Sequence, residues 1–346
     1  MIWQSGHKLY RDKYEIKQEL GRGQFAITYL AQDRNGKKVV IKTLNPSILN
    51  QLRNEERDHL KSGFADESRK LTICKHPHIV EVFETFHEGE LLCMVMEYIQ
   101  GTNLASLVNR VLPEKEALNY IQQIGQALIE VHKQRFLHRD IKPENIMIRA
   151  GKHETVLIDF DLAREFDNPL TSRGRQNHGF TPIELYSNSA VKKAERGPYT
   201  DVYSLAATLY VLLTGQQPVC AIDRKDKNER LIPPQELNHQ ISKRVNDAII
   251  HAMELETDQR PQTVAAWLRE LGLKTSWSPF SRLLIIQPLW IWILEIMGVL
   301  ALFAALISGF KDGFDLWKDI FPNNPNQRNT PLSPTQPYKP YNNQKI

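Results

Sequence analysis

The sequence predicts an α+β protein with a small β-rich lobe, a larger helical lobe and, after them, a single transmembrane helix. Short apolar runs separated by turn residues occupy residues 14 to about 100, which is typical of β-strands. From Gly101 onward, apolar residues recur at intervals of three and four, the period of an amphipathic helix. A long and nearly uninterrupted apolar run then lies near the C-terminal end.

Composition sets broad limits on the class of protein. The 346 residues are 41% hydrophobic and 24% charged, as in ordinary globular proteins. The net charge of +4 arises from 44 basic and 40 acidic residues, a balance that does not favour a nucleic-acid partner. The 3 cysteines, Cys74, Cys93 and Cys220, are widely spaced, so we expect reduced core thiols rather than disulfides. Residues 1–13 lack the apolar segment of a signal peptide, and we expect them to be an N-terminal extension in the cytosol.

The β-rich lobe is expected to contain several strands around one helix. Asn35-Gly36 is a strong hairpin signal, and Gly21 and Gly23 mark another turn. The stretch from Leu49 to Lys75 is charged and favours helix, so it predicts a single helix. The expected strands are Tyr14–Leu20, Thr28–Gln32, Lys38–Leu44, Val80–Phe86 and Leu91–Tyr98.

The larger lobe is expected to be mainly helical. Helices are predicted at Leu104–Val111 and Glu114–Gln134, and again from Asp201 onward. Short strands around Ile146–Ile148 and Val156–Ile158 interrupt this pattern. Two lobes of different composition imply a cleft between them, and such clefts commonly bind ligands.

Two features of the β-rich lobe suit phosphate binding. The run from Leu20 to Ala26 lies between two expected strands, and its glycines let backbone N–H groups approach phosphate oxygens. The alternative interpretation of these glycines is a simple hairpin turn with no ligand. Lys42 ends the apolar strand that begins at Val39, where its cation could hold phosphates, although a snorkelling surface lysine is the alternative.

The strongest signal is an ordered string of polar residues in the helical lobe. His138-Arg139-Asp140-Ile141-Lys142-Pro143-Glu144-Asn145 comes first, and Ile158-Asp159-Phe160-Asp161 follows it. Acids and an asparagine at loop positions can hold divalent cations through oxygen atoms and can place a carboxylate beside an incoming hydroxyl. The string therefore predicts a catalytic site that uses divalent cations.

These motifs, in this order and spacing, resemble those of Hanks-type (eukaryotic-like) serine/threonine protein kinases of the membrane-anchored bacterial kind. The resemblance covers residues 14 to 271. It implies a bilobal kinase fold, ATP as phosphoryl donor, and Mg²⁺, which Mn²⁺ could replace. It also implies that Lys42 holds the α- and β-phosphates and that Glu67 orients Lys42, since Glu55 and Glu56 lie too early. The glycine-rich loop over the phosphates would consist of Leu20, Gly21, Arg22, Gly23, Gln24, Phe25, Ala26, Ile27 and Thr28.

The resemblance also assigns the catalytic and metal-binding residues. Asp140 matches the catalytic base, and Lys142 matches the residue that marks serine/threonine rather than tyrosine specificity. Asn145 and Asp159 match the magnesium ligands. Protein serine and threonine hydroxyls would be the acceptors.

The resemblance also implies where the adenine base of the nucleotide binds. The backbone of Glu97 and Ile99 would contact adenine, with Met96 as gatekeeper and Met147 as the floor of the site.

Three further matches concern structure rather than chemistry. Thr181–Glu184 resembles the end of the activation segment, and Asp201 the acid that supports the catalytic loop. Arg260 matches a buried arginine expected to pair with Glu184.

The sequence departs from the family pattern at Ala26, Asn177 and Asp161. Ala26 replaces a loop glycine, and Asn177 stands where these kinases usually have threonine. Asp161 replaces the glycine after Asp159-Phe160, where it adds negative charge beside a metal ligand and adopts φ > 0 less readily. Because every phosphate- and metal-holding residue is present, we expect an active enzyme. The alternative is a nucleotide-binding pseudokinase that acts as a scaffold.

The apolar run Leu283–Phe310 is long enough to cross the roughly 30 Å hydrocarbon core of a bilayer as a helix. Glu295 interrupts it, and Trp290 and Trp292 suit a membrane interface. A buried helix of a soluble fold is the alternative. We expect a single-pass cell-membrane protein in contact with lipid, with its kinase domain in the cytoplasm, where ATP is available. Residues 272–282 would be a juxtamembrane linker and residues 311–346, rich in proline and asparagine, a disordered tail.

The predicted function is therefore membrane-linked signalling by a serine/threonine kinase that autophosphorylates, with a homodimer as the means of doing so in trans. Thr171 and Ser172 are candidate phosphorylation sites beside Arg173 and Arg175, where Arg139 could receive the phosphate. A mobile polar loop is the alternative explanation of that segment. A membrane sensor whose tail is the functional part is a further alternative, although the tail offers no ligand-binding core.

Overall fold

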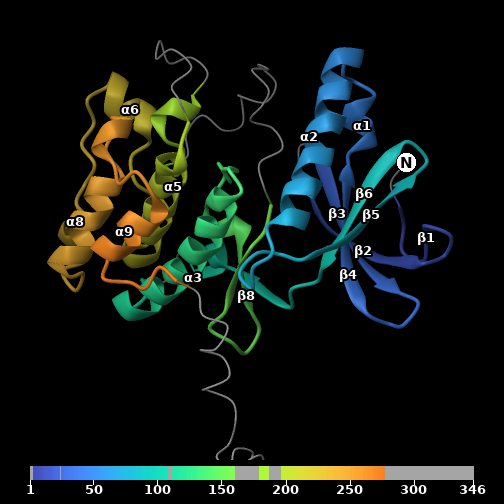
Figure 1. Ribbon diagram of the computed structural model, residues 1–346, viewed down its shortest axis with the longest axis horizontal. Helices are drawn as coiled ribbons and strands as arrows, with labels where there is room; N and C mark the ends of the chain where they lie inside the picture. Colours follow the sequence, from blue (N-terminus) through green and yellow to red (C-terminus); the bar gives the residue numbers. More distant parts are fainter. Residues whose placement is uncertain (1–2, 24, 108–110, 160–178, 187–195, 277–346) are drawn as a thin grey trace, which may run out of the picture. The chain divides into compact units, whose positions relative to one another are not determined.

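The smaller lobe contains a six-stranded antiparallel sheet in the order β1-β2-β3-β4-β6-β5 (Figure 1). A computed structural model describes residues 3–23, 25–107, 111–159, 179–186 and 196–276 of the chain. The predicted strands of this lobe are confirmed to within about two residues at each end. The strands are β1 (Lys8–Leu9), β2 (Tyr14–Arg22), β3 (Ala26–Asp33), β4 (Lys38–Leu44), β5 (Val82–Glu88) and β6 (Leu91–Glu97).

The helix predicted from Leu49 to Lys75 is present but begins only at Asn54, and a short helix that was not predicted precedes it. The side chain of Asn45 starts the first by accepting a hydrogen bond from the amide of the second residue along, at 3.1 Å. The second starts where Glu56 reaches back to the amide of Arg53, also at 3.1 Å. The second start signal lies inside the predicted range and was mistaken for helix interior, whereas Asn45 lies before that range. The helices are α1 (Pro46–Leu49) and α2 (Asn54–Ile73).

The larger lobe combines a three-stranded antiparallel sheet with helices, as the sequence predicts. In the predicted helix Leu104–Val111, the described residues form only a short 3₁₀ turn, η1 (Leu104–Leu107), which Asn103 starts by accepting from the Ser106 amide at 3.2 Å. The other elements are β7 (Gly101–Asn103), β8 (Ile146–Arg149), β9 (Thr155–Leu157), α3 (Glu114–Lys133), α5 (Pro198–Thr214), α6 (Ala221–Asp226), α7 (Pro234–Leu237), α8 (Lys243–Ala252), α9 (Val264–Glu270), η2 (Pro143–Asn145), η3 (Ile183–Leu185) and η4 (Thr257–Gln259).

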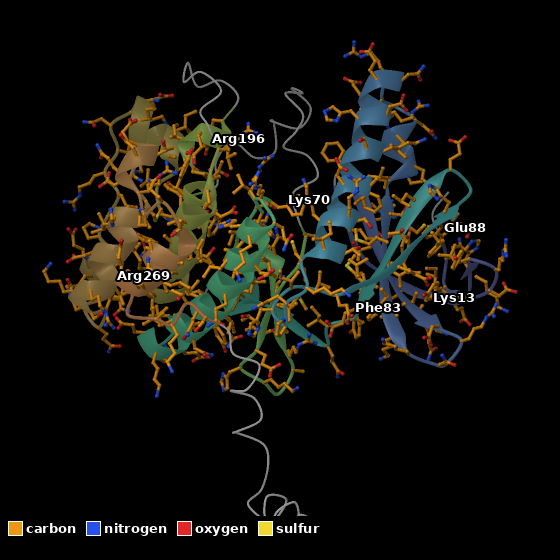
Figure 2. The ribbon with its side chains drawn as sticks, viewed as in Figure 1. Lys13, Lys70, Phe83, Glu88, Arg196 and Arg269 are labelled. Carbon is orange, nitrogen blue, oxygen red and sulfur yellow. The ribbon has the colours of Figure 1, made fainter. Side chains whose placement is uncertain are left out.

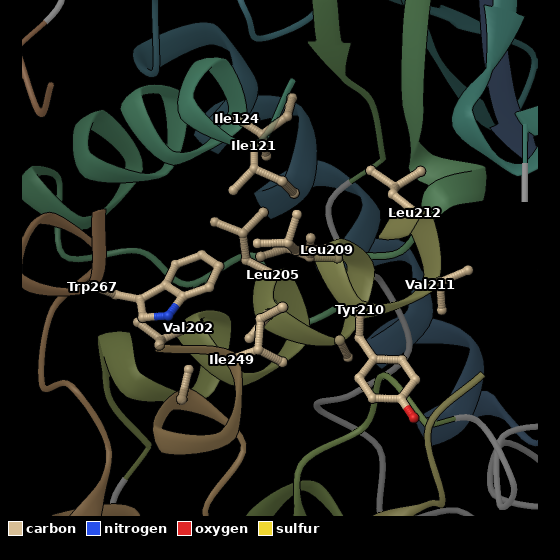
Figure 3. Packing of buried hydrophobic residues seen from close by; sticks show 14 of the residues in the cluster. Ile121, Ile124, Val202, Leu205, Leu209, Tyr210, Val211, Leu212, Ile249 and Trp267 are labelled. Carbon is tan, nitrogen blue, oxygen red and sulfur yellow. The ribbon is translucent and has the colours of Figure 1, made fainter. Parts of the chain in front are cut away.

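The core of the larger lobe is organised around α5. Its residues from Thr200 to Thr214 are all buried, which explains why its sequence is apolar on every side rather than amphipathic. Figure 3 shows Leu205 and Leu209 of α5 among side chains of α3 and α9. Trp267 of α9 is fully buried in this cluster, and its indole N–H donates to the Ala248 carbonyl at 2.9 Å. A rigid α5 can therefore position the loops that contact it.

The N-terminal residues belong to the smaller lobe in space, which the sequence did not reveal. Trp3 and Leu9 are buried against the sheet, and β1 adds an edge strand beside β2. The ring centroids of Trp3 and Tyr29 lie 5.2 Å apart. Lys13 pairs with Glu84 of β5 at 2.5 Å, and Figure 2 shows Lys13 at this side of the lobe. These residues cover an apolar face that would otherwise meet solvent.

One apolar cluster extends from α2 in the smaller lobe to α3 in the larger lobe. Phe64 and Leu71 of α2 share an apolar cluster with Ala127 and Val131 of α3. Lys70, labelled in Figure 2, lies over the ring of Phe136 at 5.8 Å, just beyond α3.

The predicted transmembrane segment Leu283–Phe310 and the tail 311–346 lie outside the described residues. In the part of the chain that the structure describes, no helix has both the length and the apolar character needed to span a bilayer.

Candidate active site

Lys42 lies between two acids that come from different parts of the chain. Its Nζ is 2.9 Å from Glu67 Oε1 on α2 and 2.6 Å from Oδ1 of Asp159, which follows β9. Of the acids that the sequence offered on this helix, Glu67 is the one that reaches the lysine. The side chains of Lys42 and Glu67 are 7% and 2% exposed, whereas that of Asp159 is 47% exposed. The ammonium of Lys42 is therefore held by Glu67 from the buried side and by Asp159 from the solvent-exposed side.

The charges around Lys42 determine its protonation. Burial would lower the pKa of Lys42, since a charged amine loses its hydration, but the carboxylates of Asp159 and Glu67 outweigh this effect and raise the pKa. Lys42 thus stays charged at physiological pH. One positive charge faces two negative charges, so a further cation would improve the balance of this group.

The loop around Asp140 orients its carboxylate through two neighbours. Lys142 Nζ donates to Asp140 Oδ2 at 2.9 Å, and Asn145 Nδ2 donates to the same oxygen at 2.8 Å. The amide of Asn145 also donates to the backbone carbonyl of Asp140 at 2.8 Å, which closes the loop. The carboxylate is 21% exposed, so a hydroxyl group from outside could reach it.

Asp201 of α5 holds this loop from beneath. Its fully buried carboxylate accepts the backbone N–H groups of His138 at 2.9 Å and Arg139 at 2.8 Å, and it lies 2.7 Å from His132 Nε2. Arg139 has φ +65, a left-handed conformation that needs such support. Although burial would raise the pKa of Asp201, the hydrogen bond with His132 and the other donors lower it. These contacts agree with the supporting role that the family resemblance implied for Asp201.

Glu184 and Arg260 form the buried pair that the sequence predicts. The guanidinium donates from Nη1 to Oε1 at 2.9 Å and from Nη2 to Oε2 at 3.1 Å, and the two side chains are 0% and 1% exposed. Backbone carbonyls of Glu254 and Leu255 accept its remaining hydrogens at 2.6 and 2.9 Å. Four of the five N–H hydrogens of the guanidinium therefore donate to acceptors within the fold.

The expected adenine site lies where β6 leaves the smaller lobe. Met96 and Ile99 are buried, and Met147 of β8 packs against the same apolar cluster as Met96. The side chain of Glu97 accepts two hydrogen bonds from Arg149, at 2.5 and 2.9 Å. This last contact could not be predicted from the sequence, because Glu97 and Arg149 lie on different strands and no local motif relates them.

The expected glycine-rich loop joins β2 to β3. Leu20, Gly21 and Arg22 end β2, and Ala26, Ile27 and Thr28 begin β3. The amide of Gly23 donates to the carbonyl of Ala26 at 2.9 Å, so the loop turns tightly as predicted for a hairpin. Leu20 is 43% exposed, and Phe25 packs partly against the cluster below the sheet. Gln24 lies outside the described residues, as do Asp161, Thr171, Ser172 and Asn177.

The chemistry of the donor atoms fits a hard divalent cation such as Mg²⁺. Asn145 uses its amide hydrogens on Asp140, which leaves its carbonyl oxygen to serve as a ligand. Asp159 uses Oδ1 on Lys42, and its second oxygen remains for a metal. Oxygen ligands of this kind suit Mg²⁺ and Mn²⁺. Nothing in the described geometry opposes the metal role predicted for both residues.

Comparison with known proteins identifies the family. The protein kinase domain matches residues 14–334, which is most of the chain. This chain belongs to the protein kinase family. Its curated relatives include bacterial serine/threonine kinases, in agreement with the Hanks-type resemblance.

Individual relatives show the extent of the likeness. A probable serine/threonine-protein kinase of Clostridium perfringens is 28% identical over 272 residues, which cover 76% of this chain and 38% of the relative. Serine/threonine-protein kinase C of Synechocystis is 33% identical over 223 residues, which cover 61% of this chain and 41% of the relative. The kinase thus spans about two fifths of the length of these relatives.

A solved structure confirms the bilobal fold. The apo form of PpkA-294 has a TM-score of 0.66 and 27% identity, with 78% of this chain and 99% of that chain covered. The kinase domain of PknI from Mycobacterium tuberculosis, at 22% identity and a TM-score of 0.59, agrees in fold.

Proposed function

We propose that this kinase transfers the γ-phosphate of ATP to serine or threonine hydroxyls of proteins. The observation that carries the proposal is the double contact of Lys42 with Glu67 and Asp159, at 2.9 and 2.6 Å, beside the oriented carboxylate of Asp140. In the family, a lysine–glutamate pair and the metal-binding aspartate must both be in position for phosphoryl transfer. The names of the curated relatives support the same acceptor class.

The reaction follows from these residues. Lys42 holds the phosphates of ATP, and Asp140 orients the acceptor hydroxyl and accepts its proton. A bond forms between the hydroxyl oxygen and the γ-phosphorus, the bond from that phosphorus to the β–γ bridging oxygen breaks, and ADP leaves. Lys142, 2.9 Å from Asp140, offsets the negative charge on that side of the site. Mg²⁺ held by Asn145 and Asp159 would neutralise charge that develops on the transferred group.

Transfer of labelled phosphate to a basic protein tests this proposal with the full chain. Lys42→Met and Asp140→Asn should each retain less than about a tenth of wild-type activity, since electrostatic positioning dominates this chemistry. Lys243→Met and Asp247→Asn are matched controls, because they repeat the same substitutions in an exposed ion pair on α8. A wild-type chain that transfers no phosphate, or an Asp140→Asn variant that keeps its rate, would refute the assignment.

We further propose that the kinase is anchored in the cell membrane by Leu283–Phe310, with the catalytic domain in the cytoplasm. The support is the length and apolar character of that run, in which Glu295 costs about 2.5–3.5 kcal/mol that the surrounding Leu, Ile, Val and Phe can offset. The protein should stay with the membrane fraction in alkaline carbonate, and its catalytic domain should be accessible to protease only from the cytoplasmic side. Recovery in the soluble fraction would contradict the anchor.

Autophosphorylation in trans, within a homodimer, is the regulatory part of the proposal. Thr171 and Ser172 are the candidate sites because Arg173 and Arg175 lie beside them in the sequence and, with Arg139 next to the catalytic base, suit a phosphate. When the wild-type chain is mixed with a tagged Asp140→Asn copy, which cannot phosphorylate itself, the tagged copy should acquire phosphate, and phosphosite mapping should find it at Thr171 or Ser172. A tagged copy that stays unphosphorylated, or no phosphate in that segment, would exclude this form of regulation.

A further inference from the structure

An ion pair crosses the connection between the two lobes. Glu97 is the last residue of β6 in the smaller lobe, and Arg149 is the last residue of β8 in the larger lobe. The guanidinium donates from Nη1 to Oε1 at 2.5 Å and from Nη2 to Oε2 at 2.9 Å, so the pair is a two-pronged fork. Such a fork fixes the orientation of both groups as well as their separation.

The fork lies on the face of β8 that serves the nucleotide base. Ile146 and Ile148 of β8 point into the core of the larger lobe, and Met147 packs against the cluster of the smaller lobe. Because side chains alternate along a strand, Arg149 shares the face of Met147. Met147 is the predicted floor of the adenine site, and Glu97 is a predicted backbone contact of adenine. One strand of the larger lobe thus supports the base and holds the connection to the smaller lobe.

Backbone contacts constrain this connection at both ends. The amide of Glu97 donates to the carbonyl of Glu81 at 2.8 Å, and the carbonyl of Gln100 accepts from Ala150 at 2.7 Å. Gly101 then passes so close to β8 that a Cβ atom there would lie 1.7 Å from the Ile148 carbonyl oxygen. Between these ends, the fork ties the side chain of Glu97, the residue that begins the connection, to the end of β8.

The surroundings of the fork argue for positioning rather than for fold stability. Its side chains are 26% and 24% exposed, and both line a cavity of about 410 Å³ formed with the end of α2 and the loop before β5. A partly hydrated ion pair stabilises a fold by only about 1 kcal/mol or less. Its geometric effect on the neighbouring peptide groups does not depend on a dry environment.

We propose that Arg149 is a positioning residue for the nucleotide: through Glu97 it sets the orientation of the backbone groups that contact the base, and so controls ATP affinity. This inference rests on the proposed function, since it concerns the same nucleotide site. Arg149 itself does not touch the reacting atoms.

Steady-state kinetics of the full chain test the proposal. Arg149→Met should raise KM for ATP about three- to tenfold while kcat at saturating ATP changes less than about twofold, since a fork of this exposure is worth about one decade at most. Arg149→Lys keeps the positive charge but cannot form the fork, so its KM for ATP should lie between those of the wild type and Arg149→Met. The inhibition constant of adenosine should rise by the same factor as KM, because adenosine carries the base without phosphates. In the double variant with Glu97→Gln, the second substitution should add little, since both remove one interaction.

Arg230→Met is the matched control, because Arg230 pairs with Glu236 at 2.7 Å on an exposed surface with side chains 70% and 50% exposed. The proposal is overturned if Arg149→Met leaves KM for ATP and the adenosine constant unchanged, or if it lowers kcat instead. Direct binding of a non-hydrolysable ATP analogue separates this inference from the proposed function. A chain that binds the analogue but transfers no phosphate refutes the function alone, and weaker binding by Arg149→Met then still supports the positioning role.

Discussion

Removing Arg260 should cost far more stability than its distance from the catalytic residues suggests. Arg260→Met leaves the carboxylate of Glu184 buried, with 1% of its side chain exposed and without the two hydrogen bonds from the guanidinium. The carbonyls of Glu254 and Leu255 also lose a donor. The ring of Tyr203, 5.0 Å from the guanidinium, loses a cation–π partner.

The magnitude follows from the burial of the pair. Breaking one side of a buried ion pair costs about 3–5 kcal/mol, because the remaining charge is uncompensated. Domains are stable by about 5–15 kcal/mol, so Arg260→Met should lose roughly a fifth or more of the total free energy of unfolding. Replacing both charges, with Glu184→Gln added to Arg260→Met, should recover at least about 1 kcal/mol, since an amide is less costly to bury than a carboxylate.

Urea unfolding of the full chain, followed by tryptophan fluorescence, measures these free energies. Trp267 is buried in the core beside α5, so its emission should report unfolding of the larger lobe. Arg230→Met, in the exposed pair with Glu236, is the control and should change stability by less than about 1 kcal/mol. The reasoning fails if Arg260→Met is as stable as the control, or if the double variant is less stable than Arg260→Met.

Three further predictions concern other parts of the molecule. Trp3→Ala should lower the stability of the smaller lobe by about 3 kcal/mol in thermal unfolding, because Trp3 is 7% exposed against Tyr29; an unchanged midpoint would show that the N-terminal residues do not support the sheet. Burial, with a smaller effect of His78, lowers the pKa of His76 to about 4. As the pH drops from 6.5 to 4, His76 therefore takes up a proton in the unfolded chain before it does so in the folded chain. The free energy of unfolding should then fall by up to roughly 3 kcal/mol. His76→Gln should remove that part of the pH dependence, and an identical profile would refute the cause. If Asp161 merely strains a glycine position, Asp161→Gly should keep or raise activity, whereas lost activity with a higher magnesium requirement would make Asp161 a metal ligand.

The sequence by itself determined the family and the order of the chemical residues. Lys42, Asp140, Asn145 and Asp159 could be named in advance, because their motifs resemble in order and spacing those of serine/threonine protein kinases. The strands could be predicted because alternation and turn residues are local signals. The roles of these residues in catalysis remain predictions for the kinetic experiments.

The resemblance to the kinase family implied that Glu67 orients Lys42, and the structure confirms this contact at 2.9 Å. Only the tertiary structure showed that Asp159, 117 residues further along the chain, contacts the same lysine at 2.6 Å. The break between α1 and α2 lay in side-chain caps that a hydrophobic pattern does not display. The Glu97–Arg149 fork joins strands of different lobes, and the burial of Trp3 depends on a sheet face that exists only after folding. Such contacts depend on non-local packing, which composition and spacing along the chain do not encode.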